Sequence, residues 1–125
     1  MNVYDHAHAL AKSIRKSSQY TEFKNASKKL QEDETARKML NDFRQTQMEH
    51  QKRKMENDTV SQEEEEKMQK LSELVNLNLT VKNYLEKEYQ LAVMIRDVQK
   101  IIGEAIEEIM EEERKEDHET ENGNH

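Results

Sequence analysis

The chain is 125 residues long, 33% hydrophobic and 38% charged, with a formal net charge of −7 and no proline, cysteine or tryptophan. This length favours one domain, and the lack of proline with only two glycines favours an all-α fold, because tight β-turns depend on those residues. Without cysteine there is no disulfide framework, thiolate metal site or iron–sulfur cluster. The longest apolar run, residues 91–95, predicts no membrane span and makes the cytoplasm the expected location.

The charge is unevenly distributed. Residues 1–30 carry six basic and two acidic side chains, whereas residues 104–125 carry ten acidic and two basic ones. A negative chain is a poor nonspecific binder of nucleic acid, so we expect no DNA partner. Two interpretations of the asymmetry stay open: mutual attraction of the two ends with a gain in solubility, or a basic face for RNA or an acidic partner.

The first predicted helix begins after Asn2, a good N-cap, and ends near residue 15. His6 and His8 are two residues apart and point to opposite sides of this helix, so they cannot share a metal ion. Its apolar side chains recur at helical spacing and are Val3, Ala7, Leu10 and Ile14.

Two further helices follow in the next forty residues. Ser17 is the expected N-cap of the second and Asp33 of the third. From Arg44 onward the inward positions of the third helix are polar, so fewer apolar contacts stabilise this part of the helix. The predicted core positions of the two helices are Tyr20, Phe23, Ala26, Leu30, Ala36, Met39, Leu40 and Phe43.

A polar hairpin is predicted around a turn at residues 57–59. Ser61 and Glu64 have the spacing of a capping box for the fourth helix. Folding back about this turn places the basic run 52–54 opposite the glutamates of 63–66, so charge pairing holds the tip. Met48 and Met55 are seven residues apart on one face. Packing within the hairpin is the usual interpretation of such a pair, and an adaptable docking site for a partner is the alternative, which makes Met48 and Met55 the candidate docking residues.

The last predicted helix, residues 80–110, has the strongest apolar pattern, and either Asn78 or Thr80 is its expected N-cap. Eight of nine positions in two heptad series are apolar, and Glu88 is the exception. We expect Glu88 to pair with Lys or Arg across a dimer axis or to lie at the edge of the seam; a buried metal ligand is the alternative. Additional apolar residues on the flanks make the stripe too wide for a two-stranded zipper. The predicted oligomer interface consists of Leu91, Ile95, Val98, Ile102, Ala105 and Ile109.

The length of this helix predicts self-association. Thirty residues of helix extend about 45 Å, whereas a compact domain of this size is about 36 Å across. We expect a homodimer or a tetramer. The predicted fold is an elongated antiparallel helical bundle of four to five helices with a long C-terminal helix, divided into a helical oligomerisation domain over residues 1–112 and a disordered acidic tail over residues 113–125.

The pattern of elements resembles the YlbF/YmcA family of small bacterial helical proteins, in particular its YheA-like branch. The resemblance covers residues 3–110 and is carried by the segments SSQYTEFKNASKKLQEDETARKMLNDFRQTQ and VQKIIGEAIEEI. Its most specific pieces are the ED before the third helix, the FRQTQ after that helix's apolar half, and the VQKII of the last helix.

The resemblance implies a cytoplasmic, oligomeric, all-α protein without a catalytic site. It also implies a link to competence, sporulation and biofilm regulation through messenger-RNA processing, and hence a protein partner in the RNA-processing machinery. The iron–sulfur clusters of the family's YlbF and YmcA members depend on cysteines, which this chain lacks, so no cofactor carries over.

The residues themselves favour a noncatalytic interaction protein. No nucleophile accompanies an oriented base, and we predict no catalytic, cofactor-binding or metal-binding residue. Two alternatives stay open: RNA binding through Lys24, Lys28 and Lys29, and a carboxylate-bridged metalloenzyme. The second is disfavoured because none of the five histidines follows a glutamate at the Glu-x-x-His spacing.

Overall fold

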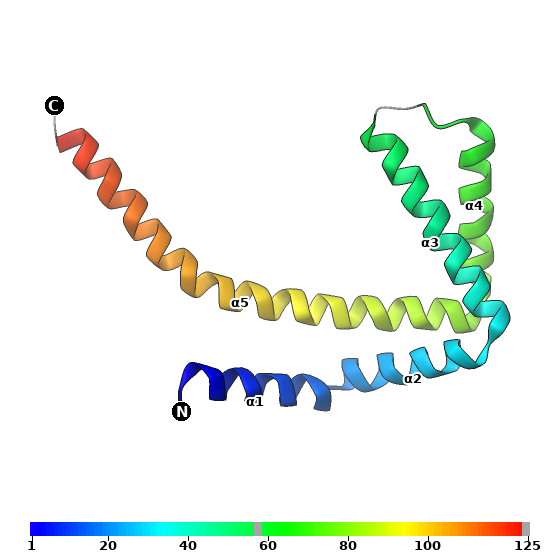
Figure 1. The fold of residues 1–125 in the computed structure, drawn as a ribbon, viewed down its shortest axis with the longest axis horizontal. Helices are drawn as coiled ribbons and strands as arrows, with labels where there is room; N and C mark the ends of the chain where they lie inside the picture. The colour runs from blue at the N-terminus through cyan, green and yellow to red at the C-terminus, as the bar shows by residue number, and fades with distance from the viewer. Residues whose placement is uncertain (57–58, 124–125) are drawn as a thin grey trace. The chain divides into compact units, whose positions relative to one another are not determined.

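The computed structural model describes residues 1–56 and 59–123, with side chains as far as residue 120. Its described part contains five helices and no strand, which confirms the all-α prediction. In chain order the helices are α1 (Val3–Lys16), α2 (Ser18–Glu32), α3 (Glu34–Met55), α4 (Gln62–Leu77) and α5 (Leu79–Gly123). Figure 1 shows α3 and α4 as a hairpin and α5 as the long C-terminal helix.

Each helix begins at a polar cap residue whose side chain accepts a hydrogen bond from a backbone N–H of the first turn. The caps of α2, α3 and α5 are Ser17, Asp33 and Asn78, with N–H to oxygen distances of 3.2, 3.0 and 3.0 Å. These bonds satisfy donors that have no partner inside the helix. Of the two predicted N-caps of α5, Asn78 and Thr80, Asn78 is the one that the structure shows.

The capping box expected at Ser61 is only half formed. Ser61 accepts the hydrogen bond from the Glu64 N–H at 3.2 Å, but the Glu64 carboxylate pairs with Arg53 of α3 instead of the cap backbone. A cation on the neighbouring helix offers that carboxylate a charge-assisted partner. The full box lies at Asn2, which exchanges both hydrogen bonds with Asp5.

The hydrophobic core joins α2, α3, α4 and the start of α5. Its buried cluster has Val81 and Ala36 fully enclosed at 0% exposure. Phe23 packs on Tyr84 with ring centroids 5.3 Å apart, which attaches α2 to α5. The other members of the cluster are Leu30, Leu40 and Val75, and Met39, Phe43, Tyr84 and Leu85 pack against it.

Helix α5 extends beyond its predicted end. We expected it to end near Met110 and a disordered tail from residue 113, whereas the structure continues the helix to Gly123. The added segment, residues 111–123, contains six Glu, one Lys and one Arg, all with high helix propensity, and it has no Pro or Gly before Gly123. The absence of apolar residues is therefore a poor signal for the end of a helix. The division between domain and tail stays a prediction.

The chain divides into two units, Met1–Leu91 and Ala92–His125. The first contains α1 to α4 and the beginning of α5, and it holds the core. The second consists, over its described residues, of the remainder of α5 alone. Within the described residues, none of the helices has the length and apolar character needed to cross a membrane.

Candidate interaction surfaces

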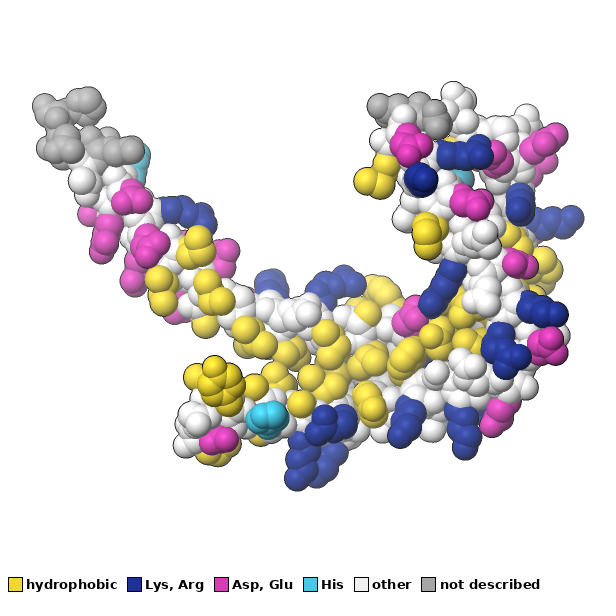
Figure 2. Space-filling model, in the orientation of Figure 1, with side chains coloured by type: hydrophobic (Ala, Val, Ile, Leu, Met, Phe, Trp, Pro, Cys, Tyr) yellow, Lys and Arg dark blue, Asp and Glu magenta, His cyan; other side chains and the backbone are white. Residues whose placement is uncertain are grey.

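The outer part of α5 presents an apolar face to solvent. Its large side chains are 47% to 67% exposed, and Figure 2 shows hydrophobic side chains continuing along this part of the helix. Isolated exposed apolar residues are common on protein surfaces, but a contiguous row of them marks an interaction site. We call this row the α5 face, and it consists of Ile101, Ile102, Ala105, Ile106, Ile109 and Met110.

The six residues predicted as an oligomer interface fall into two groups. Leu91, Ile95 and Val98 are half-buried. The other three, Ile102, Ala105 and Ile109, are exposed and belong to the α5 face. The prediction omitted three members of this face, although their helical spacing signalled them as flanks of the seam. These omitted residues are Ile101, Ile106 and Met110.

Glu88 lies in an ion pair with Arg44 of its own chain, whereas the sequence pattern predicted a basic partner across a dimer axis. Both of its carboxylate oxygens accept hydrogen bonds from Arg44, at 2.6 and 2.8 Å, and the Arg44 guanidinium lies 5.7 Å from the centroid of the Tyr84 ring. Partial burial lowers the pKa of Arg44, but the hydrogen bond and charge of Glu88 raise it by more, so the pKa lies above its ordinary value. The pair joins α3 to α5; with both side chains about two-fifths exposed, it contributes about 0 to 1 kcal/mol.

A shallow groove of about 390 Å³ borders this ion pair. Met48 is 69% exposed and forms part of its wall. Met55 is 85% exposed and is the last residue of α3. The exposure of both shows that they do not pack within the hairpin, and their docking role stays a prediction. The groove residues are Phe43, Arg44, Gln47, Met48, Gln51, Leu85 and Glu88.

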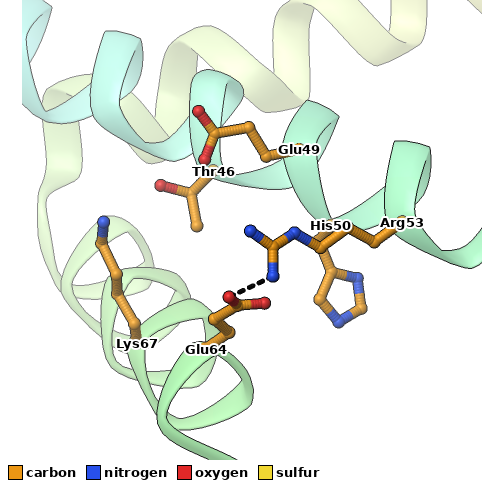
Figure 3. A pocket seen from close by; sticks show the side chains of 6 residues that line it. All are labelled: Thr46, Glu49, His50, Arg53, Glu64 and Lys67. Carbon is orange, nitrogen blue, oxygen red and sulfur yellow. Dashed lines mark hydrogen bonds and ion pairs between the residues drawn. The ribbon is translucent and has the colours of Figure 1, made fainter. Parts of the chain in front are cut away.

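A second pocket, of about 160 Å³, lies between α3 and α4. Figure 3 shows Arg53 of α3 pointing at Glu64 of α4, with His50 beside them. The pocket's two acidic and two basic side chains balance, so it has no net preference for an anion or a cation. The pair confirms the predicted charge pairing of the hairpin. The pocket residues are Thr46, Glu49, His50, Arg53, Glu64 and Lys67.

The basic side chains of α1 and α2 are all exposed, and Figure 2 shows Lys and Arg along one edge of these helices. They are Lys12, Arg15, Lys16, Lys24, Lys28 and Lys29. Among the residues whose side chains are described, no group of three or more His, Asp or Glu could hold a metal ion.

These features define a small all-α protein with a charged helical hairpin and a long terminal helix that bears an unpartnered apolar face. The chain belongs to the YlbF/YmcA family: the family model described as "Control of competence regulator ComK, YlbF/YmcA" matches residues 3–107. It is 37% identical over 107 residues to a UPF0342 protein of Halothermothrix orenii, covering 86% of this chain and 91% of that one.

Solved structures show the same fold. A protein of unknown function (DUF964) from Bacillus stearothermophilus matches with a TM-score of 0.69 and 27% identity, over 85% of this chain and 93% of that one. YheA from Bacillus subtilis matches with a TM-score of 0.61 and 27% identity, over 87% and 99%. Bacillus subtilis RicA, solved in complex with RicF, matches with a TM-score of 0.62 and 25% identity, over 85% and 94%. The resemblance identified from the sequence is thereby confirmed.

Proposed function

We propose that this protein is a noncatalytic, oligomeric scaffold of the cytoplasm that regulates by binding other proteins. The observation that carries the proposal is the α5 face, whose large side chains are about half or more exposed on the part of α5 that contributes no residue to the core cluster. The family's link to control of a competence regulator and the RicA–RicF complex of a structural neighbour both support an interaction role.

The biological process follows from the family resemblance. It is regulation of competence, sporulation or biofilm formation through messenger-RNA processing, with a protein of that machinery as the partner. The α5 face serves assembly in this proposal, and the Met48 groove on the hairpin serves the partner. The two surfaces lie on separate units, so each can be altered without touching the other.

Replacing Met48 with Glu tests the docking role. We expect Met48→Glu to lose at least about tenfold in capture of a protein that the wild type captures from its bacterium, because a carboxylate replaces a thioether in a partly apolar groove. Quantitative mass spectrometry of the captured proteins measures the loss.

Gln45→Glu is the matched control, since it adds the same charge at an exposed site on the same helix. Equal capture by the wild type and Met48→Glu, or equal loss in both variants, contradicts a docking role for the groove.

A second candidate function, RNA binding, is supported by the exposed basic side chains of α1 and α2. If it holds, replacing Lys24, Lys28 and Lys29 with Glu lowers the slope of log affinity against log salt by about 2, because about three phosphate contacts are lost. Fluorescence anisotropy with single-stranded RNA at several salt concentrations measures this slope.

The control variant replaces Lys52, Lys54 and Lys70 with Glu, which changes the net charge equally at exposed sites on the hairpin. No binding by the wild type at low salt, or equal slopes for the two variants, removes this candidate.

A further inference from the structure

The outer part of the α3–α4 hairpin lies beyond the buried core. The buried residues of α3 are Ala36 and Leu40, in its first half, and the buried residue of α4 is Val75, near its C-terminal end. Residues 44–55 of α3 and 62–70 of α4 are all exposed or half-buried, and we call these two segments the distal arm. Apolar burial, which drives the packing of the core, therefore contributes little to holding the distal arm together.

The facing sides of the distal arm are loosely packed and polar. Besides the pocket of about 160 Å³ at Arg53, two hollows of about 260 and 480 Å³ border the same two helices. Thr46 and Glu49 of α3 and Lys67 of α4 line two of the three, and Figure 3 shows how these polar side chains lie around the first. Few close contacts between apolar atoms are therefore lost when the two helices separate.

Charge joins the two halves of the distal arm. The Arg53 guanidinium pairs with the Glu64 carboxylate, and the two side chains are 46% and 38% exposed, so dissolved salt screens the pair. The last turn of α3 carries three basic residues, 52–54, and the first turn of α4 carries three acidic ones, 63–65. These signs also favour each helix end through its dipole, and salt screens that effect as well. The closure of the distal arm thus depends on ionic strength.

The Met48 groove takes one of its walls from the distal arm. Gln47, Met48 and Gln51 lie on the arm, whereas Leu85 and Glu88 belong to α5. A helical segment of about twelve residues is marginally stable in water unless it packs against a neighbour. Opening of the distal arm therefore removes the α3 wall of the groove while its α5 side stays in place.

We propose that the Arg53–Glu64 pair is a salt-sensitive latch that controls the Met48 groove. With the pair closed, the distal arm is folded and the groove has both walls. With the pair screened, the distal arm opens while the core cluster around Leu40 stays folded, in the manner of local openings that leave a core intact. The inference rests on the proposed docking role of the groove and adds its regulation by ionic strength.

Hydrogen–deuterium exchange of the full chain, followed by mass spectrometry, tests the latch without any partner. In about 0.01 M and about 1 M sodium chloride the Debye length is about 30 Å and about 3 Å, so the second condition screens the pair far more strongly. We expect exchange in residues 47–55 and 62–68 to accelerate about two- to fivefold at the higher salt, the change that loss of an exposed ion pair produces. Exchange in residues 36–43 should not change.

Reversing the charge of Arg53 should open the distal arm without added salt. Arg53→Glu places a second carboxylate beside Glu64, so we expect exchange in the distal arm at least about threefold faster than in the wild type at low salt, and slower once salt is added. Lys54→Glu is the matched control, since it makes the same change of charge in the same turn of α3, at an exposed position about 100° round the helix from Arg53. Its effect should stay below about twofold.

Equal acceleration by the two variants, or exchange in the distal arm that is the same at both salt concentrations, overturns the latch. Acceleration limited to residues 52–55, with residues 47–51 unchanged, overturns its control of the groove. Failure of the docking role is distinguishable from failure of the latch. Normal capture by Met48→Glu removes docking even where Arg53→Glu opens the arm, whereas lost capture with unchanged exchange in Arg53→Glu removes the latch alone.

Discussion

Replacing Ile102 and Ile109 together with Asp is expected to convert the assembled protein into single folded chains. Each isoleucine loses about 1.5 to 3 kcal/mol of burial, and a symmetric pair loses four of them. Because these side chains are 55% and 62% exposed in the single chain, only about half of that burial is gained on association, so the penalty is at least about 3 kcal/mol, or at least about a hundredfold weaker association. Sedimentation velocity at matched concentrations measures the change.

The variant should remain helical, because neither isoleucine belongs to the core cluster. Gln90→Asp is the matched control, since it adds a negative charge at an exposed position of α5 outside the α5 face. Unchanged sedimentation of the double variant contradicts a role for the α5 face in assembly. Dissociation of the control to the same extent would mean that the added negative charge, and not the loss of the apolar face, separates the chains.

The second large effect is expected in the core of the first unit. Leu40→Ala should lower the free energy of unfolding by about 2 to 5 kcal/mol, because Leu40 is 4% exposed and its truncation leaves a cavity among packed side chains. Denaturant unfolding at a fixed protein concentration measures the loss, since association itself contributes to stability.

Leu77→Ala is the matched control, with the same chemical change at a residue that is 79% exposed near the end of α4. We expect its effect on the free energy of unfolding to stay within about 0.5 kcal/mol. Equal destabilisation by the two variants would mean that the cluster around Leu40 is not the core that holds the helices together.

The helices and their caps could be predicted from the sequence because both depend on residues within one turn of each other. Ser17 and Asp33 were identified as caps from their type and position alone. The partner of Glu64 could not be identified in this way, since the choice between its own helix and Arg53 depends on how closely α3 and α4 approach. The sequence indicated a basic partner for Glu88, but identifying Arg44 as that partner required the fold.

The candidate surfaces could be predicted only in part, because residue spacing shows which side chains share a helix face but not which neighbours cover them. Helical periodicity identified the seam through Ile102 and Ile109, but not that these two residues remain exposed. The helical end of the chain was missed because charged residues with high helix propensity carry no apolar period.

Self-association through α5 is the central claim, and sedimentation equilibrium of the wild-type chain at micromolar concentration tests it most directly. The predicted result is a mass that is a whole multiple of the 14.9 kDa chain and that decreases on dilution. A folded protein that keeps the mass of one chain across the whole concentration series would contradict it.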